Sequence, residues 1–124
     1  MPGKQCILVV DDEAGLQKLV RRHVERQGHE VLEALTSAEG LAEAIAGKPD
    51  LILLDLHLPD GSGLALLGKL KADPRTMNIP VLAWSGSDAV ESEIEVLGAG
   101  AREYFDKSDV KPLIRRIVEL LNAK

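Results

Sequence analysis

The chain has 124 residues, a net charge of −5 at pH 7 and dispersed basic side chains, which argues against direct binding of nucleic acid. It contains one Trp, one Tyr and one Phe, too few for a surface on which bases stack. No apolar stretch approaches the roughly 18 residues that a membrane span requires, and the single cysteine, Cys6, cannot form an internal disulfide, so we expect a cytoplasmic protein without a membrane partner.

The first half of the chain alternates short apolar runs with helical patterns. Three runs predict strands, at residues 7–10, 31–34 and 51–54. The helix after the first strand ends at Gly28, and Thr36 or Ser37 caps the next helix. The positions expected to face the core from these two helices are Leu16, Leu19, Val20, Val24, Leu41, Ala42 and Ile45.

The second half begins with a segment rich in Pro and Gly, residues 59–63, which predicts a loop. Two further strands are expected, at residues 80–84 and 103–105. Three helices are expected here, one before, one between and one after these strands. Their inward positions are Leu64, Leu67, Leu70, Val90, Ile94, Leu97, Val110, Leu113, Ile114, Ile117, Val118 and Leu121. The fourth helix of the chain is expected to begin near Asp88.

Five strand-then-helix units in succession predict a doubly wound α/β fold, in which a five-stranded parallel sheet carries helices on both faces. The uniformly apolar strands suit such a sheet, because both of its faces are covered. We expect a single domain over residues 1–124, with residues 1–4 frayed. Whether this domain stands alone or belongs to a longer protein stays open.

Two of the apolar runs break off at carboxylates. Asp11 and Asp12 follow the first strand, and Asp55 follows the third. A charge cannot continue inside a layer that is covered on both faces unless it is paired, so these acids lie just past the strand ends, where open α/β sheets bind ligands. Three carboxylates gathered there repel one another and raise at least one pKa unless a cation joins them. A hard divalent ion is the natural partner.

The last two strands end at side chains that suit phosphate, Ser85 and Lys107. Together with VVDDE at residues 9–13, LDLHLPDG at 54–61 and GAREYFDK at 100–107, they make the chain resemble the receiver domain of bacterial two-component response regulators. The resemblance covers essentially the whole chain. It implies a flavodoxin-like sheet of strand order 2-1-3-4-5, which makes the first and third strands neighbours.

By this resemblance Asp55 is the phosphoacceptor, attacking the phosphorus of a phosphohistidine on a sensor histidine kinase or histidine phosphotransfer protein. The family's Mg²⁺ (or Mn²⁺) would be held directly by Asp12 and largely through water by Asp11. Asp55 and the backbone carbonyl of His57 would complete the protein ligands, and this short set suffices because Mg²⁺ keeps several waters.

The resemblance also assigns the residues around the phosphoryl group. Lys107 would pair with one phosphoryl oxygen and the Ser85 hydroxyl would bind another. Movement of Ser85 toward the phosphate would open space for Tyr104 to swing inward, which is the family's usual switch. His57 is expected to modulate dephosphorylation through water access, and Ser87 is a second modulating position.

The chain would then be a phosphoacceptor signalling domain, not an enzyme, that assists its own phosphorylation and dephosphorylation. Its switch would act on a downstream protein partner or output domain, and it would be a monomer or a phosphorylation-dependent dimer. The sequence names neither the kinase nor the output.

Two departures from the family pattern bear on this interpretation. Ser108 follows Lys107 where the family usually has a proline in a cis bond, so the loop is either trans and reshaped or cis under strain. Trp84 is bulkier than the aliphatic residue more common before the hydroxyl position. Ser108 supports an alternative, a pseudo-receiver that binds partners without phosphorylation. A small metal-dependent phosphatase is a third candidate, although no general base is visible in the sequence.

Overall fold

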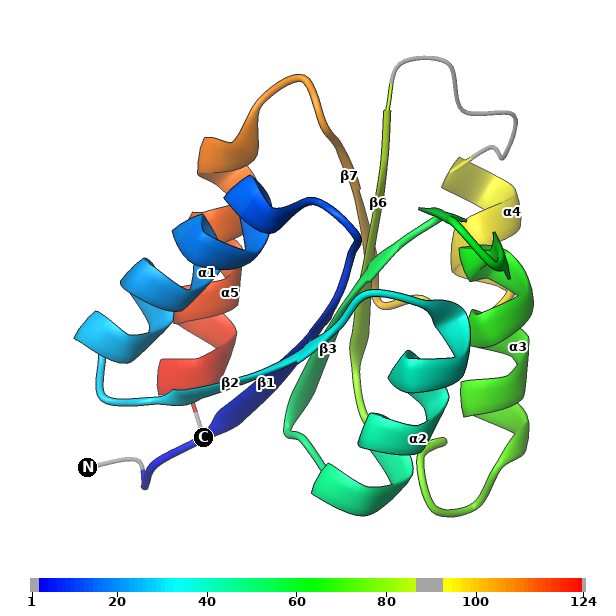
Figure 1. The fold of residues 1–124 in the computed structure, drawn as a ribbon, viewed down its shortest axis with the longest axis horizontal. Helices are drawn as coiled ribbons and strands as arrows, with labels where there is room; N and C mark the ends of the chain where they lie inside the picture. The colour runs from blue at the N-terminus through cyan, green and yellow to red at the C-terminus, as the bar shows by residue number, and fades with distance from the viewer. Residues whose placement is uncertain (1–2, 87–92, 124) are drawn as a thin grey trace.

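The computed structural model describes residues 3–86 and 93–123, and its centre is a parallel sheet (Figure 1). The strands of this sheet are β1 (Cys6–Val10), β2 (Glu30–Ala34), β3 (Leu51–Asp55), β6 (Val81–Ser85) and β7 (Glu103–Asp106). Their order is β2-β1-β3-β6-β7, and each neighbouring pair is parallel. Counted along the chain within this sheet, the order is the predicted 2-1-3-4-5, so the predicted doubly wound α/β fold is confirmed.

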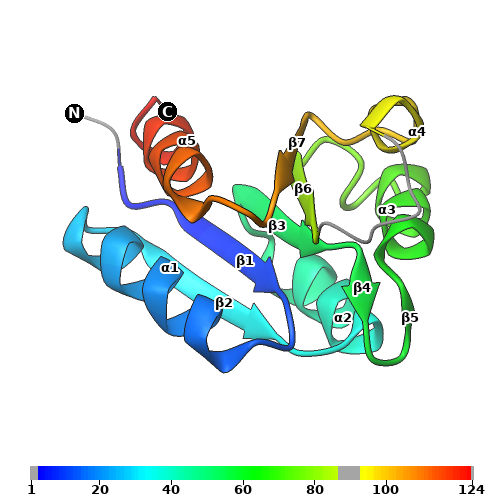
Figure 2. The same ribbon diagram turned by 90° about the horizontal axis from the view of Figure 1, so that it is seen from above.

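Helices cover both faces of the sheet (Figure 2). Those described are α1 (Ala14–Arg26), α2 (Ser37–Gly47), α3 (Gly63–Ala72), α4 (Glu93–Gly98) and α5 (Val110–Asn122). Helices α1 and α5 lie together on one face, and α2, α3 and α4 lie on the other. Within the described ranges, none of these helices has the length and apolar character that a membrane crossing demands.

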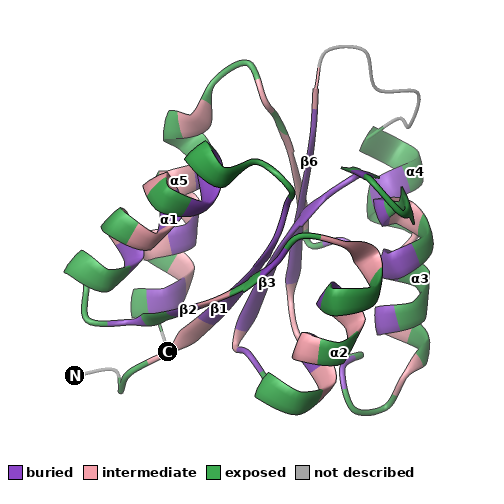
Figure 3. Cartoon of the chain, viewed as in Figure 1, coloured by how far each residue is buried: buried purple, intermediate pink, exposed green. Residues whose placement is uncertain are grey.

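The sheet divides the hydrophobic core into two clusters, because successive side chains of a strand point to opposite faces. On β6, for example, Ala83 belongs to the cluster under α2, α3 and α4, whereas Leu82 and Trp84 belong to the cluster under α1 and α5. The central strands β1, β3 and β6 are buried along most of their length, the edge strands β2 and β7 are less so, and the outer helix surfaces are exposed (Figure 3). This burial explains why the strands read as nearly unbroken apolar runs.

Helix α2 begins at a side-chain cap, and its buried face differs from the prediction. The Thr36 hydroxyl accepts a hydrogen bond from the Glu39 backbone N–H at 3.1 Å, which resolves the choice between the two predicted caps. Ala44 and Gly40 are the buried positions, whereas Ala42, predicted to face inward, is exposed. Small residues at the buried positions let α2 approach the sheet closely: a Cβ added to Gly40 would contact Val10.

The inward face predicted for the fourth helix is wrong. Ile94 is 85% exposed and Leu97 is 38% exposed, whereas Val96 is fully buried in the core. The described part of α4 is short and lies beside β7, the edge strand, so a single buried position is enough to fix it. Val90 and the predicted start near Asp88 lie outside the described residues.

The segment predicted as a plain loop after β3 contains a small antiparallel hairpin. Strand β4 (His57–Leu58) pairs with β5 (Gly61–Ser62). Each strand has two residues, too few to produce a periodic pattern in the sequence. The turn residue Asp60 accepts hydrogen bonds from the first backbone N–H groups of α2, at Ser37 (2.7 Å) and Ala38 (3.1 Å), so the hairpin is anchored to that helix.

Candidate functional site

The three acids predicted to converge lie at the carboxyl edge of the sheet. Strands β1 and β3 are adjacent and Val10 is in register with Leu54, so Asp11 and Asp55 leave the sheet side by side. Oxygen atoms of Asp11, Asp12 and Asp55 all lie within 4.8 Å of one another. Asp11 and Asp55 are buried, at 0% and 2% exposure, whereas Asp12 is exposed. The cluster therefore has two inner carboxylates and one that faces solvent.

Both carboxylate oxygens of Asp11 are fixed by protein donors. The Glu13 backbone N–H donates to Oδ1 at 2.8 Å, and the Trp84 indole N–H donates to Oδ2 at 3.0 Å. Burial nevertheless raises the pKa of Asp11 from 3.8 to about 6, and the nearby charge of Asp55 adds to the rise. A raised pKa in this cluster was predicted from charge repulsion, but the larger cause is desolvation.

Asp55 is held at the end of β3 by one donor on each oxygen. The His57 backbone N–H donates to Oδ1 at 2.9 Å, and the Lys107 ammonium donates to Oδ2 at 3.0 Å. The chain turns closely here, because Gly63 packs on the backbone behind the acid: a Cβ at Gly63 would overlap the Asp55 carbonyl oxygen. Gly63 thus lets α3 begin directly against the loop that carries Asp55.

Lys107 is the cation of this cluster. Its Nζ lies 3.0 Å from Glu13 Oε1, 3.0 Å from Asp55 Oδ2 and 3.4 Å from Asp11 Oδ2. Partial burial lowers the pKa of Lys107, but the hydrogen bonds to Glu13 and Asp55 and the surrounding negative charge outweigh it, so the pKa is raised. Lys107 stays charged at neutral pH.

The loop after Lys107 is the trans form of the two that the sequence left open, since no cis peptide bond occurs in the described residues. The Lys107 backbone N–H donates to the Ser85 carbonyl at 2.8 Å, which continues the pairing of β7 with β6. The Ser108 N–H then donates to Asp106 Oδ1 at 2.8 Å, and Asp109 caps α5. Lys107 therefore reaches Asp55 without a proline after it.

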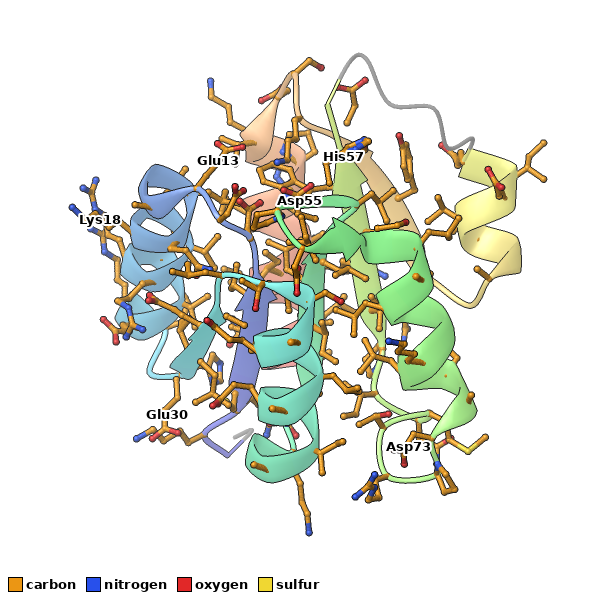
Figure 4. All side chains as sticks on the ribbon, turned by 45° about the vertical axis from the view of Figure 1, so that its right-hand side comes forward. Glu13, Lys18, Glu30, Asp55, His57 and Asp73 are labelled. Atoms are coloured by element: carbon orange, nitrogen blue, oxygen red, sulfur yellow. The ribbon has the colours of Figure 1, made fainter. Side chains whose placement is uncertain are left out.

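A cavity of about 410 Å³ opens over the acids. Its lining residues are Asp12, Glu13, Asp55, His57, Gly86 and Lys107. In Figure 4, Glu13, Asp55 and His57 cluster at the same end of the sheet, whereas Lys18 lies on the outer side of α1. A small anionic group could thus reach Asp55 from solvent while touching Lys107.

Two other predicted residues, Ser85 and Tyr104, are not among the described lining residues of this cavity. Ser85 is fully buried, and its hydroxyl oxygen has no hydrogen-bond partner among the described residues. Tyr104 is half-buried on β7 and packs against the cluster under α2, α3 and α4. Ser87 lies outside the described residues. The roles of these residues, and those of the His57 side chain and carbonyl, stay predictions.

The roles of three residues that shape the site were not predicted from the sequence. Glu13 pairs with Lys107, and Trp84 holds Asp11, although only the bulk of Trp84 was noted. Gln17 is buried on α1, and its Nε2 donates to the carbonyls of Val9 and Asp11, both at 3.0 Å. A polar residue at a core-facing position next to Leu16 was the signal that could have revealed Gln17.

The donor set fits a hard divalent cation. Every candidate ligand is a carboxylate oxygen, the three groups are close enough to share one ion, and one of them faces solvent, where an ion that keeps its waters can sit. Lys107 already neutralises part of the charge, so a metal ion and the ammonium would share the same carboxylates.

Comparison with known proteins finds curated relatives that are longer than this chain. The DNA-binding dual master transcriptional regulator RpaA of Synechocystis sp. is 35% identical over 93% of the chain and 48% of RpaA. The phosphate regulon transcriptional regulatory protein PhoB of Pseudomonas aeruginosa is 37% identical over 98% of the chain and 53% of PhoB. The chain thus spans about half the length of these relatives.

Solved structures match the fold along nearly the whole chain. A CheY-like response regulator receiver domain protein of Methanospirillum hungatei superposes with a TM-score of 0.84 at 30% identity, covering 98% of this chain and 96% of that one. The phosphorylated cyanobacterial phytochrome response regulator RcpA gives 0.79 at 26% identity, covering 94% and 90%. The Mn²⁺-bound response regulator Rcp1 gives 0.76 at 26% identity, covering 94% and 91%.

These relatives correct one expectation. Nucleic acid was excluded as a partner from the charge and the few aromatic residues, but RpaA is by name a DNA-binding regulator. Composition describes only the residues of this chain, whereas the relatives carry about as much chain again beyond the part that matches.

A family model, the response regulator receiver domain, matches residues 7–119. This range contains both inner carboxylates, the lysine and all five strands of the parallel sheet except the first residue of β1. The chain therefore belongs to the response regulator receiver domain family.

Proposed function

We propose that this chain is a phosphorelay receiver in which Asp55 accepts a phosphoryl group from a phosphohistidine in a Mg²⁺-dependent reaction. The observation that carries the proposal is the position of Asp55, whose Oδ2 contacts Lys107 at 3.0 Å on the wall of an open cavity shared with Asp12. The solved relatives RcpA and Rcp1, described as phosphorylated and as Mn²⁺-bound, support both halves of it.

The transfer requires little covalent chemistry from the protein. A carboxylate oxygen of Asp55 attacks phosphorus, the P–N bond to the donor imidazole breaks, and its electron pair stays on the ring nitrogen. Lys107 would balance charge on the phosphoryl oxygens, and its existing contact with Asp55 supports this role. A divalent ion held by Asp11, Asp12 and Asp55 would supply further positive charge there.

Phosphorylation would add about −1.5 to −2 charge at Asp55, so the Lys107 ammonium would exchange its contact with the Asp55 carboxylate for one with a phosphoryl oxygen. The buried Ser85 hydroxyl, which lacks a partner among the described residues, is the donor available to a phosphoryl oxygen. Tyr104, two residues along β7 from the register partner of Ser85, would respond and change partner binding. The relatives' names make a DNA-binding output segment one such partner in a longer protein.

The domain would act as a phosphoacceptor that assists its own phosphorylation and dephosphorylation, without turnover of other substrates. The pseudo-receiver alternative rested on Ser108. That support weakens because Lys107 contacts Asp55 with Ser108 in place.

The direct test is incubation with acetyl phosphate, with and without Mg²⁺, followed by detection of a hydroxylamine-sensitive phosphorylated band. Asp55→Asn is nearly isosteric and should remove the band, whereas Asp109→Asn, an exposed helix-cap control, should keep it. A band of equal strength in Asp55→Asn would refute the acceptor assignment. If the wild type gives no band and beryllofluoride leaves Trp84 fluorescence unchanged, the pseudo-receiver is correct.

A further inference from the structure

Trp84 contacts three parts of the site from one position. Its indole N–H donates to Asp11 Oδ2 at 3.0 Å, and the Lys107 ammonium lies 4.8 Å from the centre of its ring. Its backbone carbonyl accepts the N–H of Leu56 at 3.1 Å, directly after Asp55. Trp84 was expected only to alter core packing, but it contacts Asp11, Lys107 and the backbone just after Asp55.

The register of the sheet explains this reach. Trp84 is opposite Asp55 in the β3–β6 pair, and its side chain points to the face covered by α1 and α5. The ring fills that core, where it is 3% exposed, with its N–H edge toward Asp11 and one face toward the Lys107 ammonium. A buried indole needs an acceptor for its N–H, and here the acceptor is a carboxylate of the cation cluster.

We propose that Trp84 is a positioning residue of the divalent-cation site. The indole N–H fixes the rotation of the Asp11 carboxylate, and the ring face seats the Lys107 ammonium beside Asp55. This inference rests on the proposed function, because it supposes that Asp11, Asp12 and Asp55 bind an ion. Partners that orient a metal's ligands typically change its affinity by about 10–100-fold when they are removed.

Two variants separate positioning from packing. Trp84→Phe keeps an aromatic ring and loses the N–H. Leu82→Ala is the matched control, because Leu82 lies two residues earlier on the same strand and in the same core cluster. Among the described residues, no hydrogen bond joins Leu82 to the acids. Both variants should lower the melting temperature. In calorimetric titration with MgCl₂ at pH 7, only Trp84→Phe should bind more weakly, by about tenfold.

A second measurement needs no variant. Trp84 is the single tryptophan, so its indole N–H gives one cross-peak in a ¹⁵N-correlated spectrum, and MgCl₂ should shift it. Equal Mg²⁺ affinities in Trp84→Phe, Leu82→Ala and wild type, or an indole peak that stays in place at saturating Mg²⁺, would overturn the positioning role. Absence of Mg²⁺ binding by the wild type would instead refute the cation site of the proposed function, and the inference with it.

Discussion

The ammonium of Lys107 is paired with Asp55 Oδ2 at 3.0 Å, so the proposed acceptor is neutralised before any phosphoryl group arrives. Asp55 is buried and Lys107 is largely so. A buried carboxylate that loses its partner is costly, because the remaining charge has neither water nor a counterion. The pair therefore stabilises the resting protein as well as prepares the site.

Lys107→Ala should destabilise the protein by about 1–3 kcal/mol in EDTA, less than for a fully buried pair because the cavity admits water. Mg²⁺ should then raise the melting temperature more in the variant than in wild type, because the ion takes over the role of the ammonium. Lys18→Ala, which removes an exposed lysine of α1, is the control and should change neither value. An equal rise in melting temperature on adding Mg²⁺ to Lys107→Ala and to wild type would show that the ion does not take over the role of the ammonium.

The raised pKa of Asp11 predicts how the free energy of unfolding depends on pH. Its pKa is raised from 3.8 to about 6 by burial, so the folded state holds this proton more tightly than the unfolded chain. Its contribution to stability is therefore complete below about pH 4 and is lost as the pH rises through 6. We expect a loss of about 1–2 kcal/mol without metal, because each pKa unit corresponds to about 1.4 kcal/mol and Lys107 offsets part of the effect.

Urea denaturation of wild type and Asp11→Asn in EDTA, at pH values from 4 to 7, checks this. Asparagine cannot ionise, so the free energy of unfolding of the variant should gain on that of wild type as the pH rises. A difference between the two proteins that does not change with pH would show that Asp11 does not titrate in this window.

Two glycines of α3 should respond in opposite ways to alanine. At Gly63 a Cβ would overlap the Asp55 carbonyl and crowd the Leu56 Cα, whereas at Gly68 nothing lies within 4 Å. Gly63→Ala should cost about 1–3 kcal/mol or more and slow phosphorylation by displacing Asp55. Gly68→Ala should stabilise the helix by roughly 0.5–1 kcal/mol. Thermal melts with an acetyl phosphate assay compare them, and a neutral Gly63→Ala would show that the loop can yield.

The His57 side chain is exposed on β4 and lines the cavity over Asp55. If it limits the access of water, His57→Ala should shorten the lifetime of the aspartyl phosphate severalfold while leaving Mg²⁺ affinity unchanged. The decay of a ³²P-labelled protein measures this. A lifetime equal to that of wild type would leave His57 without a modulating role.

The sequence predicted the sheet and the acid cluster because their causes are local. Buried parallel strands are continuously apolar, and an acid at the end of such a run marks the edge of the sheet. The strand order implied by the family resemblance made the first and third strands neighbours, so Asp11 and Asp55 were expected to lie close together. A cap of α2 at Thr36 or Ser37 followed from short-range hydrogen bonding in the same way, and the structure selects Thr36.

Other features depended on packing that a pattern does not contain. In the described part of α4, Val96 is the buried side chain, although Ile94 and Leu97 were equally good apolar candidates in the sequence. The bond from Trp84 to Asp11 joins residues 73 positions apart and depends on side-chain reach across β3. The strands β4 and β5 are too short to produce a periodic pattern in the sequence.

The division of the core by the sheet has an evolutionary corollary. Substitutions in the cluster under α1 and α5 and in the cluster under α2, α3 and α4 contact different neighbours, so their effects on folding free energy should add. Each half can then drift in sequence on its own, and new surface specificities can arise on one side without eroding the other. The two halves share the backbone of the sheet, and at its carboxyl edge the contacts of Lys107 with Asp11 and Asp55 restrict which substitutions the end of the sheet tolerates.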